Sequence, residues 1–303
     1  MTAPDNAMAL GLHTYSLYLH GIGQAWAGFE LPWERQLSTF ELFDLGIELG
    51  LDGFHLDDGV LESLEKSYLK EVGASAAERG LFLEYNMTMD LGGLGIGIQH
   101  DLAGGIETAS AIGADIVKVS MDLPRPRPRA GSRFHSKVMP YLETARDRLA
   151  AAAPLAEDRG IRLALENHCD SFSQEVLWVI EAVDHPAVGA CIDTMNAWHM
   201  TEDPMQAIEN LAPRAFTNHF RDDRIEFCRD GFKVCGTAVG DGDIDMKGAY
   251  ELIRTLSDCR RIIIETEMGF SLDDRQAALD GELDAIRRSI DFCRNVLGIG
   301  QGA

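Results

Sequence analysis

Four acidic or imidazole side chains stand at the ends of short apolar segments in the second half of the chain. Glu166 ends LALE, Asp193 ends ACID, His219 ends FTNH and Glu265 ends IIIE. Three carboxylates held close together repel one another strongly at low dielectric unless a cation neutralises them. Carboxylate oxygens with one imidazole nitrogen suit Mn²⁺, Mg²⁺, Co²⁺ or Zn²⁺. The four residues are therefore candidate ligands of one divalent cation, with Mn²⁺ favoured.

These residues lie in a regular alternation that runs along the whole chain. Short apolar or β-branched runs alternate with longer stretches of helical period, which predicts βα units and a parallel sheet. Helices are predicted, for example, over residues 40–49 and 174–183. The eight predicted strands span residues 9–16, 53–57, 81–87, 115–121, 162–167, 188–194, 215–220 and 261–267.

Eight such units in 303 residues predict a (β/α)8 TIM barrel, a fold for which about 250 residues is typical. An open, doubly wound sheet is the alternative, but no G-x-G-x-x-G turn follows the first strand. No linker interrupts the chain, so we expect one domain over residues 1–303 with frayed ends at 1–7 and 298–303. Because active sites of barrels lie at the carboxyl ends of the strands, the four candidate ligands should converge there.

Composition narrows the class of partner. The chain has 27 Lys and Arg against 49 Asp and Glu, a formal charge of −22, which disfavours nucleic acids and anionic membrane surfaces as partners. No apolar run reaches the roughly 18 residues of a membrane span, and the opening MTAPDNAMALG lacks secretory-signal features. The six scattered cysteines form no C-x-x-C pair, so we expect reduced thiols in a cytoplasmic protein.

Two other classes fit the sequence less well. A DNA-repair endonuclease with three metal ions needs more histidine and acidic ligands and a basic groove, which the negative charge opposes. A non-catalytic sugar-binding module has polar walls but no need for four converging metal ligands. The metal content of the purified protein separates an enzyme from such a module.

An ordered set of segments carries a family resemblance. LALENHCD, CIDTMNAWH, FTNHFRD, VGDGDID and IIIETE together resemble the sugar phosphate isomerase/epimerase group of xylose isomerase-like barrels. The resemblance implies that Glu166, Asp193, His219 and Glu265 bind the metal, and that Glu166 and Glu265 are also the acid/base pair. It implies a homo-oligomer that isomerises or epimerises a ketose or oxo-sugar by glutamate-mediated proton transfer through a metal-stabilised cis-enediolate.

The chain also departs from one branch of that group. Ketose 3-epimerases usually have Asn three residues after the first Glu and His three residues after the Asp, where this chain has Cys169 and Asn196. His199 is a candidate for the missing imidazole. The same enolate can collapse by C–C or C–O cleavage, so the alternative is a metal-dependent lyase that cleaves a 3-oxo-glycoside, or dehydrates or decarboxylates an oxo-sugar.

Further polar residues near the strand ends suit a polyhydroxylated ligand. Each also has a structural alternative, such as loop hydrogen bonding for His168, or an ion pair with Asp222 for Arg221. The candidates for substrate binding are His168, Asn196, His199, Arg221, His13 and Glu84. We expect a small sugar or oxo-sugar as substrate, and the acidic surface favours an unphosphorylated one.

Two loops contain sequence features that are typical of anion-binding sites. VGDGDID resembles a phosphate cradle, but its three aspartates would repel phosphate, so we expect a turn before a helix capped by Asp243 or Asp245. The segment 124–135 carries the basic residues Arg125, Arg127, Arg129 and Arg133, with His135 beside them. It is a candidate anion site, lid or subunit-interface arm.

Overall fold

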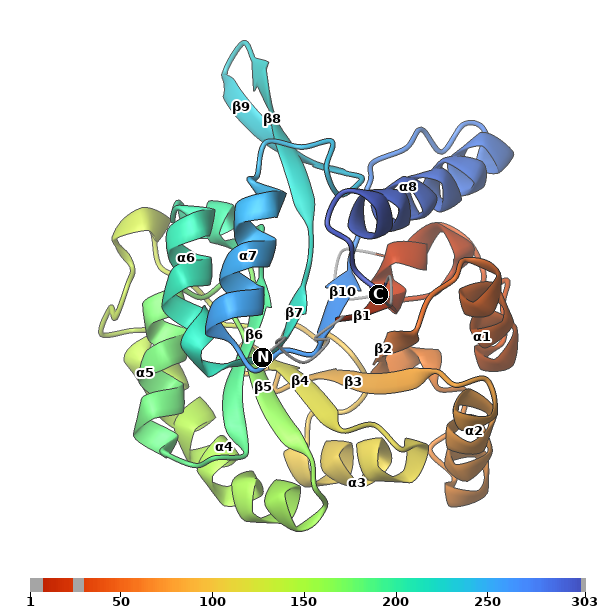
Figure 1. Cartoon of the computed structure of the whole chain (residues 1–303). Helices are drawn as coiled ribbons and strands as arrows, with labels where there is room; N and C mark the ends of the chain where they lie inside the picture. Colours follow the sequence, from red (N-terminus) through yellow and green to blue (C-terminus); the bar gives the residue numbers. More distant parts are fainter. Residues whose placement is uncertain (1–7, 24–29, 301–303) are drawn as a thin grey trace, which may run out of the picture.

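Eight parallel strands form a closed barrel in the computed structural model, which describes residues 8–23 and 30–300. Their order around the barrel is β10-β1-β2-β3-β4-β5-β6-β7. The strands are β1 (Ala9–His13), β2 (Gly53–Asp57), β3 (Phe82–Thr88), β4 (Ile116–Ser120), β5 (Arg162–Glu166), β6 (Val188–Asp193), β7 (Ala215–His219) and β10 (Arg261–Ile264). Figure 1 shows them at the centre of the molecule. The predicted (β/α)8 barrel is confirmed.

The barrel closes between β7 and β10 by fewer contacts than elsewhere. A parallel bridge pairs Phe220 with Ile264, and the Phe220 N–H donates to the Ile263 carbonyl at 2.7 Å. The Asn218 side chain adds two bonds, accepting from Ile263 N at 3.2 Å and donating to the Arg261 carbonyl at 2.8 Å. These contacts satisfy backbone groups that would otherwise be buried without partners.

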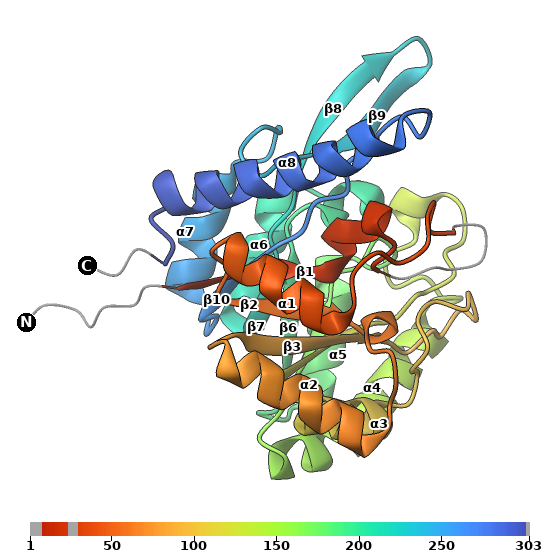
Figure 2. The same cartoon turned by 90° about the vertical axis from the view of Figure 1, so that its right-hand side faces the viewer.

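Helices surround the barrel, as Figures 1 and 2 show. Ser38 illustrates how one begins: its hydroxyl accepts from the Glu41 N–H, and the Glu41 carboxylate accepts from the Ser38 N–H, a capping box. No helix within the described ranges is long and apolar enough to cross a membrane. The helices are α1 (Thr39–Glu48), α2 (Lys66–Glu78), α3 (Leu102–Ile112), α4 (Met139–Asp158), α5 (Ser173–Val183), α6 (Pro204–Leu211), α7 (Met246–Leu256) and α8 (Arg275–Asn295).

Apolar and polar residues divide between the two faces of the strands. Leu10, Leu12, Phe54 and Leu56 are fully buried in the core cluster that the strands share with the helices. The barrel axis is filled differently, because Glu84 there accepts from Thr217 Oγ1 at 2.6 Å and lies 3.0 Å from His55 Nδ1. A layer of hydrogen-bonded polar side chains therefore supports the mouth of the barrel from below.

Strand ends differ from the prediction in two places that matter for the site. The first strand ends at His13, and a 3-10 helix over Thr14–His20 follows, so Tyr15 is not a strand residue. The last strand ends at Ile264, and Glu265 is the first residue beyond it. Within the predicted frayed ends, residues 1–7 and 301–303 lie outside the described residues. The prediction that the chain forms one domain stays a prediction.

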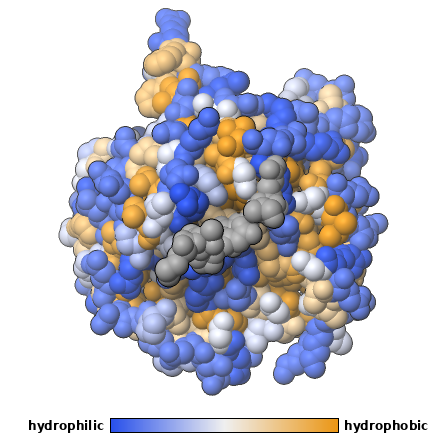
Figure 3. Space-filling model, viewed as in Figure 1, coloured by the Kyte–Doolittle hydropathy of each residue, from blue (hydrophilic) through white to orange (hydrophobic). Residues whose placement is uncertain are grey.

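A β-hairpin that was not predicted follows β7. Strands β8 (Asp222–Cys228) and β9 (Gly231–Thr237) pair antiparallel and project from the barrel in Figures 1 and 2. Phe227 and Phe232 are register partners near its tip and are 88% and 63% exposed. Figure 3 shows hydrophobic residues on this projection.

The predicted turn before the next helix is present, with Asp245 accepting from Gly248 N as the N-cap of α7.

The basic loop after β4 is anchored by its first arginine. Arg125 forms a buried ion pair with Glu175 of α5 and donates to the Asp170 carbonyl. Arg129 donates to the Cys169 carbonyl at 2.9 Å. Because a buried guanidinium needs a partner and this one has Glu175, Arg125 holds the loop against α5 and is not an anion site.

Candidate metal centre and active-site cavity

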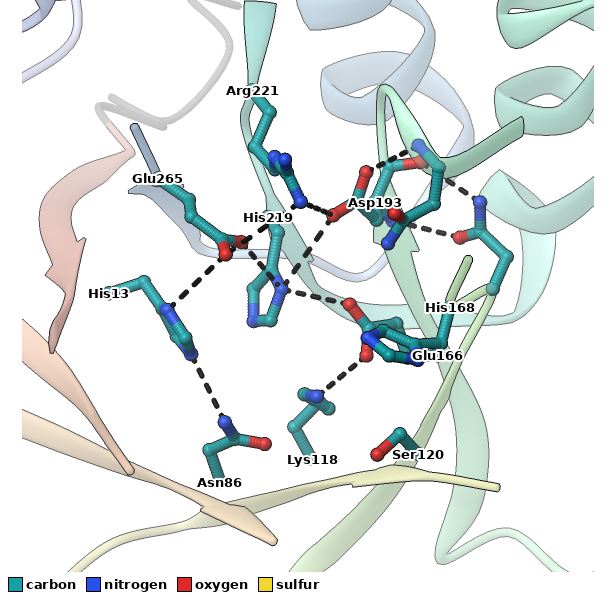
Figure 4. A network of polar contacts seen from close by, with 12 residues as sticks. His13, Asn86, Lys118, Ser120, Glu166, His168, Asp193, His219, Arg221 and Glu265 are labelled. Carbon is teal, nitrogen blue, oxygen red and sulfur yellow. Dashed lines mark hydrogen bonds and ion pairs between the residues drawn. The ribbon is translucent and has the colours of Figure 1, made fainter. Parts of the chain in front are cut away.

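The four predicted ligands lie together at the carboxyl end of the barrel. Glu166, Asp193 and His219 are the last residues of β5, β6 and β7, and Glu265 follows β10. His219 Nδ1 lies 3.0 Å from Glu166 Oε1, 3.0 Å from Glu265 Oε2 and 4.0 Å from Asp193 Oδ2. All four are at least 95% buried. Figure 4 shows the three carboxylates around one side of the imidazole.

The donor set fits a divalent cation. Glu166, Asp193 and His219 each offer one ligand atom, and these atoms lie within 4.8 Å of one another. Apart from its 3.0 Å contact with His219 Nδ1, the buried Glu265 Oε2 has no hydrogen-bond partner among the described residues. Burial raises the pKa of Asp193 to about 7, and although burial lowers the pKa of His219, Glu265 and Glu166 raise it to about 10. A bound proton or a bound cation lowers the electrostatic repulsion between such closely spaced carboxylates.

Backbone groups orient Asp193 toward this centre. Its Oδ1 accepts from Met195 N at 2.8 Å and from Asn196 N at 2.7 Å, which leaves Oδ2 facing His219. The Asn167 side chain, which follows β5, binds the backbone of Asp193 at the end of β6. It donates to the Asp193 carbonyl at 2.9 Å and accepts from the Asp193 N–H at 2.8 Å. Supporting bonds of this kind fix the direction of a metal ligand.

Two permanent cations adjoin the centre. Lys118 of β4 donates to Glu166 Oε2 at 2.6 Å, and this pairing raises the pKa of Lys118 although burial lowers it. Arg221 contacts Asp193 Oδ2 at 3.5 Å and Glu267 Oε2 at 2.5 Å. Lys118 was not among the predicted site residues. Its signal was a charged residue inside the apolar run IVKVS.

A cavity of about 410 Å³ opens beside the metal centre, and Glu166, His219 and Glu265 line it. It includes five of the six residues predicted to bind substrate, and the apolar side chains of Leu94 and Ile96 also face it. These five are His13, His168, Asn196, His199 and Arg221. Their roles in binding stay predictions.

The sixth residue, Glu84, does not line this cavity in the described part of the chain. It is fully buried in the barrel axis, where Arg261 Nη1 lies 3.2 Å from its Oε1. Although burial raises the pKa of Glu84, His55 and Arg261 lower it below its usual value. Inward-facing residues recur every second position of a strand, so Glu84 lies one layer below Asn86, which does reach the cavity. Glu84 therefore lies below the cavity, and its role in binding substrate stays a prediction.

Comparisons with known proteins agree with this architecture. The chain is 27% identical, over 252 residues, to a 3-oxo-isoapionate decarboxylase of Pectobacterium atrosepticum, covering 82% of this chain and 81% of the relative. D-psicose 3-epimerase with D-tagatose from Clostridium cellulolyticum H10 matches with 16% identity, 96% and 99% coverage of the two chains and a TM-score of 0.66.

A further solved structure was determined with a metal. It is a xylose isomerase-like TIM barrel protein from Mycobacterium smegmatis in complex with magnesium, with 17% identity, 94% and 97% coverage and a TM-score of 0.63. At these identities the two structures show the fold alone. The model of the family described as xylose isomerase-like TIM barrel matches residues 43–296, which confirms the superfamily that the sequence motifs indicated. The chain therefore belongs to the xylose isomerase-like TIM barrel family.

Proposed function

We propose that this chain is a divalent-cation-dependent decarboxylase of an oxo-sugar acid. The observation that carries the proposal is the 2.6 Å contact between Lys118 Nζ and Glu166 Oε2 at the metal centre. The 27% identity to a decarboxylase over most of both chains supports the same reaction type. Decarboxylation was one of the lyase alternatives left open by the sequence, beside cleavage of a 3-oxo-glycoside and dehydration.

The Lys118 contact makes Glu166 a poor base. Burial alone would raise the pKa of Glu166, but Lys118 and His219 hold it well below its usual value. Removal of a proton from carbon is most efficient when the pKa of the base is near the working pH. Loss of CO₂ requires no base, because the carbon–carbon electrons move onto the neighbouring carbonyl oxygen. It requires a positive group near that oxygen and a donor that returns a proton to carbon.

The residues around the centre can divide these tasks. Glu166, Asp193, His219 and Glu265 would hold the cation, which when bound polarises the substrate carbonyl and stabilises negative charge on its oxygen. The Lys118 ammonium lies next to Glu166 and lines the cavity, where it adds positive charge near the substrate carbonyl oxygen, and solvent water returns the proton to carbon. Arg221 lines the cavity and its buried Nε donates no hydrogen bond among the described residues, so we assign it to the substrate carboxylate.

A second candidate is the predicted isomerase or epimerase. The positions of Glu166 and Glu265 favour this reaction. Glu166 Oε1 and Glu265 Oε2 each lie 3.0 Å from His219 Nδ1, and Figure 4 shows the two carboxylates on either side of that nitrogen. Two carboxylates on opposite sides of a bound substrate suit removal and return of a proton on opposite faces. Under either reaction, the proposed ion is Mn²⁺, and the protein is proposed to be a homo-oligomer with a cytoplasmic location.

One experiment separates the two reactions. The Mn²⁺-loaded protein is incubated in D₂O with a panel of 3-oxo sugar acids and, separately, of ketoses. The proposal expects CO₂ release from a 3-oxo acid, with one solvent deuterium on the carbon that carried the carboxylate. Deuterium entering recovered ketoses without CO₂ release would overturn it in favour of the second candidate. Neither signal at saturating Mn²⁺ would refute both.

A further inference from the structure

The wall of the cavity carries a second group of side chains with metal-ligand chemistry. Nδ1 of His168 lies 3.3 Å from Asp122 Oδ1 and 3.8 Å from Asp170 Oδ1. One ligand atom from each residue lies within 4.8 Å of the other two, and all three residues line the cavity. None of them belongs to the four-residue centre, although His168 follows Glu166 by two positions.

The two aspartates point unsatisfied oxygens at the same place. Asp122 and Asp170 are 1% and 7% exposed, and apart from their contacts with His168 the Oδ1 atom of each has no hydrogen-bond partner within the described ranges. The opposite oxygen of each is fixed: Asp122 Oδ2 accepts from Thr88 Oγ1 and Ser120 Oγ, and Asp170 Oδ2 accepts from Leu123 N. A carboxylate held by one oxygen and presenting the other is the usual arrangement of a metal ligand.

The charge of the cavity wall points the same way. Its permanent cations are Lys118 and Arg221, and its carboxylates outnumber them by four. With Asp193 of the first centre counted as well, the carboxylates exceed the permanent cations by five, which is more than one divalent cation offsets. The carboxylates of the lining are Asp57, Asp122, Glu166, Asp170, Glu265 and Glu267.

We propose that Asp122, His168 and Asp170 form a second divalent-cation site beside the first. Two carboxylate oxygens and one imidazole nitrogen suit Mn²⁺, Co²⁺ or Zn²⁺, and the cavity gives the ion access from solvent. A cation at this point of the wall would bind oxygen atoms of a polyoxygenated substrate. The proposal concerns metal binding and does not depend on which reaction the protein catalyses.

The test counts bound ions in the full chain. Protein stripped with a chelator is titrated with Co²⁺ by equilibrium dialysis, and bound metal is measured by mass spectrometry. Wild type is expected to bind two Co²⁺ per chain. Asp170→Asn should weaken one of them by at least about tenfold, whereas Asp193→Asn should weaken the other. The exposed Asp280→Asn in α8 is the matched control and should keep both.

Position and folding are checked independently. Crystals soaked in Co²⁺ should show anomalous density between Asp122 and Asp170, and circular dichroism should show that each variant is folded. One Co²⁺ per folded wild-type chain would overturn the second site, as would two Co²⁺ retained in both Asp170→Asn and His168→Gln. Two bound ions without CO₂ release or deuterium exchange would overturn the proposed function and leave the second site standing.

Discussion

Lys118 and Glu166 form an ion pair inside the barrel mouth, with Nζ and Oε2 2.6 Å apart and both residues at least 96% buried. The other oxygen of Glu166 lies 3.0 Å from His219 Nδ1. One carboxylate thus links a permanent cation to the candidate metal centre. The charge of Glu166 is shared between Lys118 and whatever occupies the centre, so the two are expected to affect each other.

Replacing Lys118 tests this link through stability. In metal-free protein Lys118→Met leaves Glu166 as a buried charge without its lysine, which should lower the free energy of unfolding by about 3–5 kcal/mol. Saturating Mn²⁺ should recover at least half of the loss, because the cation then offsets the carboxylate. Urea unfolding with and without Mn²⁺ measures both values. The exposed Lys247→Met is the control, and an equal loss in the two variants would contradict the prediction.

Removing the metal should destabilise the folded protein, because the four ligands come together to bind the ion only in the folded state. Free Mn²⁺ at 100 times the dissociation constant of a site stabilises the folded state by about 2.7 kcal/mol. Wild type should therefore gain about 2.7 kcal/mol more from Mn²⁺ than Asp193→Asn does. The comparison uses urea unfolding in EDTA and at fixed free Mn²⁺. The same gain in both proteins would show that Asp193 does not bind the ion.

Glu265 can be tested by its effect on turnover. Glu265→Gln keeps the size of the side chain but removes a charge from the centre, and should lower turnover by about 10²–10⁴-fold. Glu166→Gln should have an effect of similar size, since both residues adjoin His219. Rates of CO₂ release and of deuterium incorporation are measured at saturating Mn²⁺. Wild-type rates in either variant would remove that residue from the mechanism.

The sequence predicted the parts of this molecule that depend on local pattern. Apolar runs ending in a charged residue located β5, β6 and β7 and placed Glu166, Asp193 and His219 at their ends. The depth of a residue within the barrel was harder to predict. Glu84 and Asn86 look equivalent in sequence, and their different layers follow from how neighbouring strands are staggered around the barrel.

Contacts between distant loops could not be predicted from sequence either. Asp122 follows β4 and Asp170 follows β5, and 48 positions separate them, so only the folded barrel brings them to His168. Lys118 was hidden for a related reason, because a lysine in an apolar strand usually indicates an edge or an error in the assignment. Its partner, Glu166, is on the neighbouring strand.

The anchor of the basic loop gives a prediction about stability. Glu175→Gln should leave Arg125 as a buried, unpaired cation and lower the free energy of unfolding by about 3–5 kcal/mol. Arg127→Ala, in the exposed part of the same loop, should change it by less than about 0.5 kcal/mol. Urea unfolding of both variants in the same buffer provides the comparison. A loss below about 1 kcal/mol for Glu175→Gln would mean that water reaches Arg125.

Gly189 in β6 tests how closely the barrel strands pack. A Cβ added there would lie 2.4 Å from the Arg214 carbonyl oxygen and 2.5 Å from the Phe216 ring, and the first of these is backbone that cannot rotate away. Gly189→Ala should therefore destabilise the protein by about 1–3 kcal/mol. Gly269 has no atom within 4 Å of an added Cβ, so Gly269→Ala should have an effect within about 0.5 kcal/mol of zero. Thermal and urea unfolding measure both variants, and equal stabilities would show that β6 can move outward at little cost.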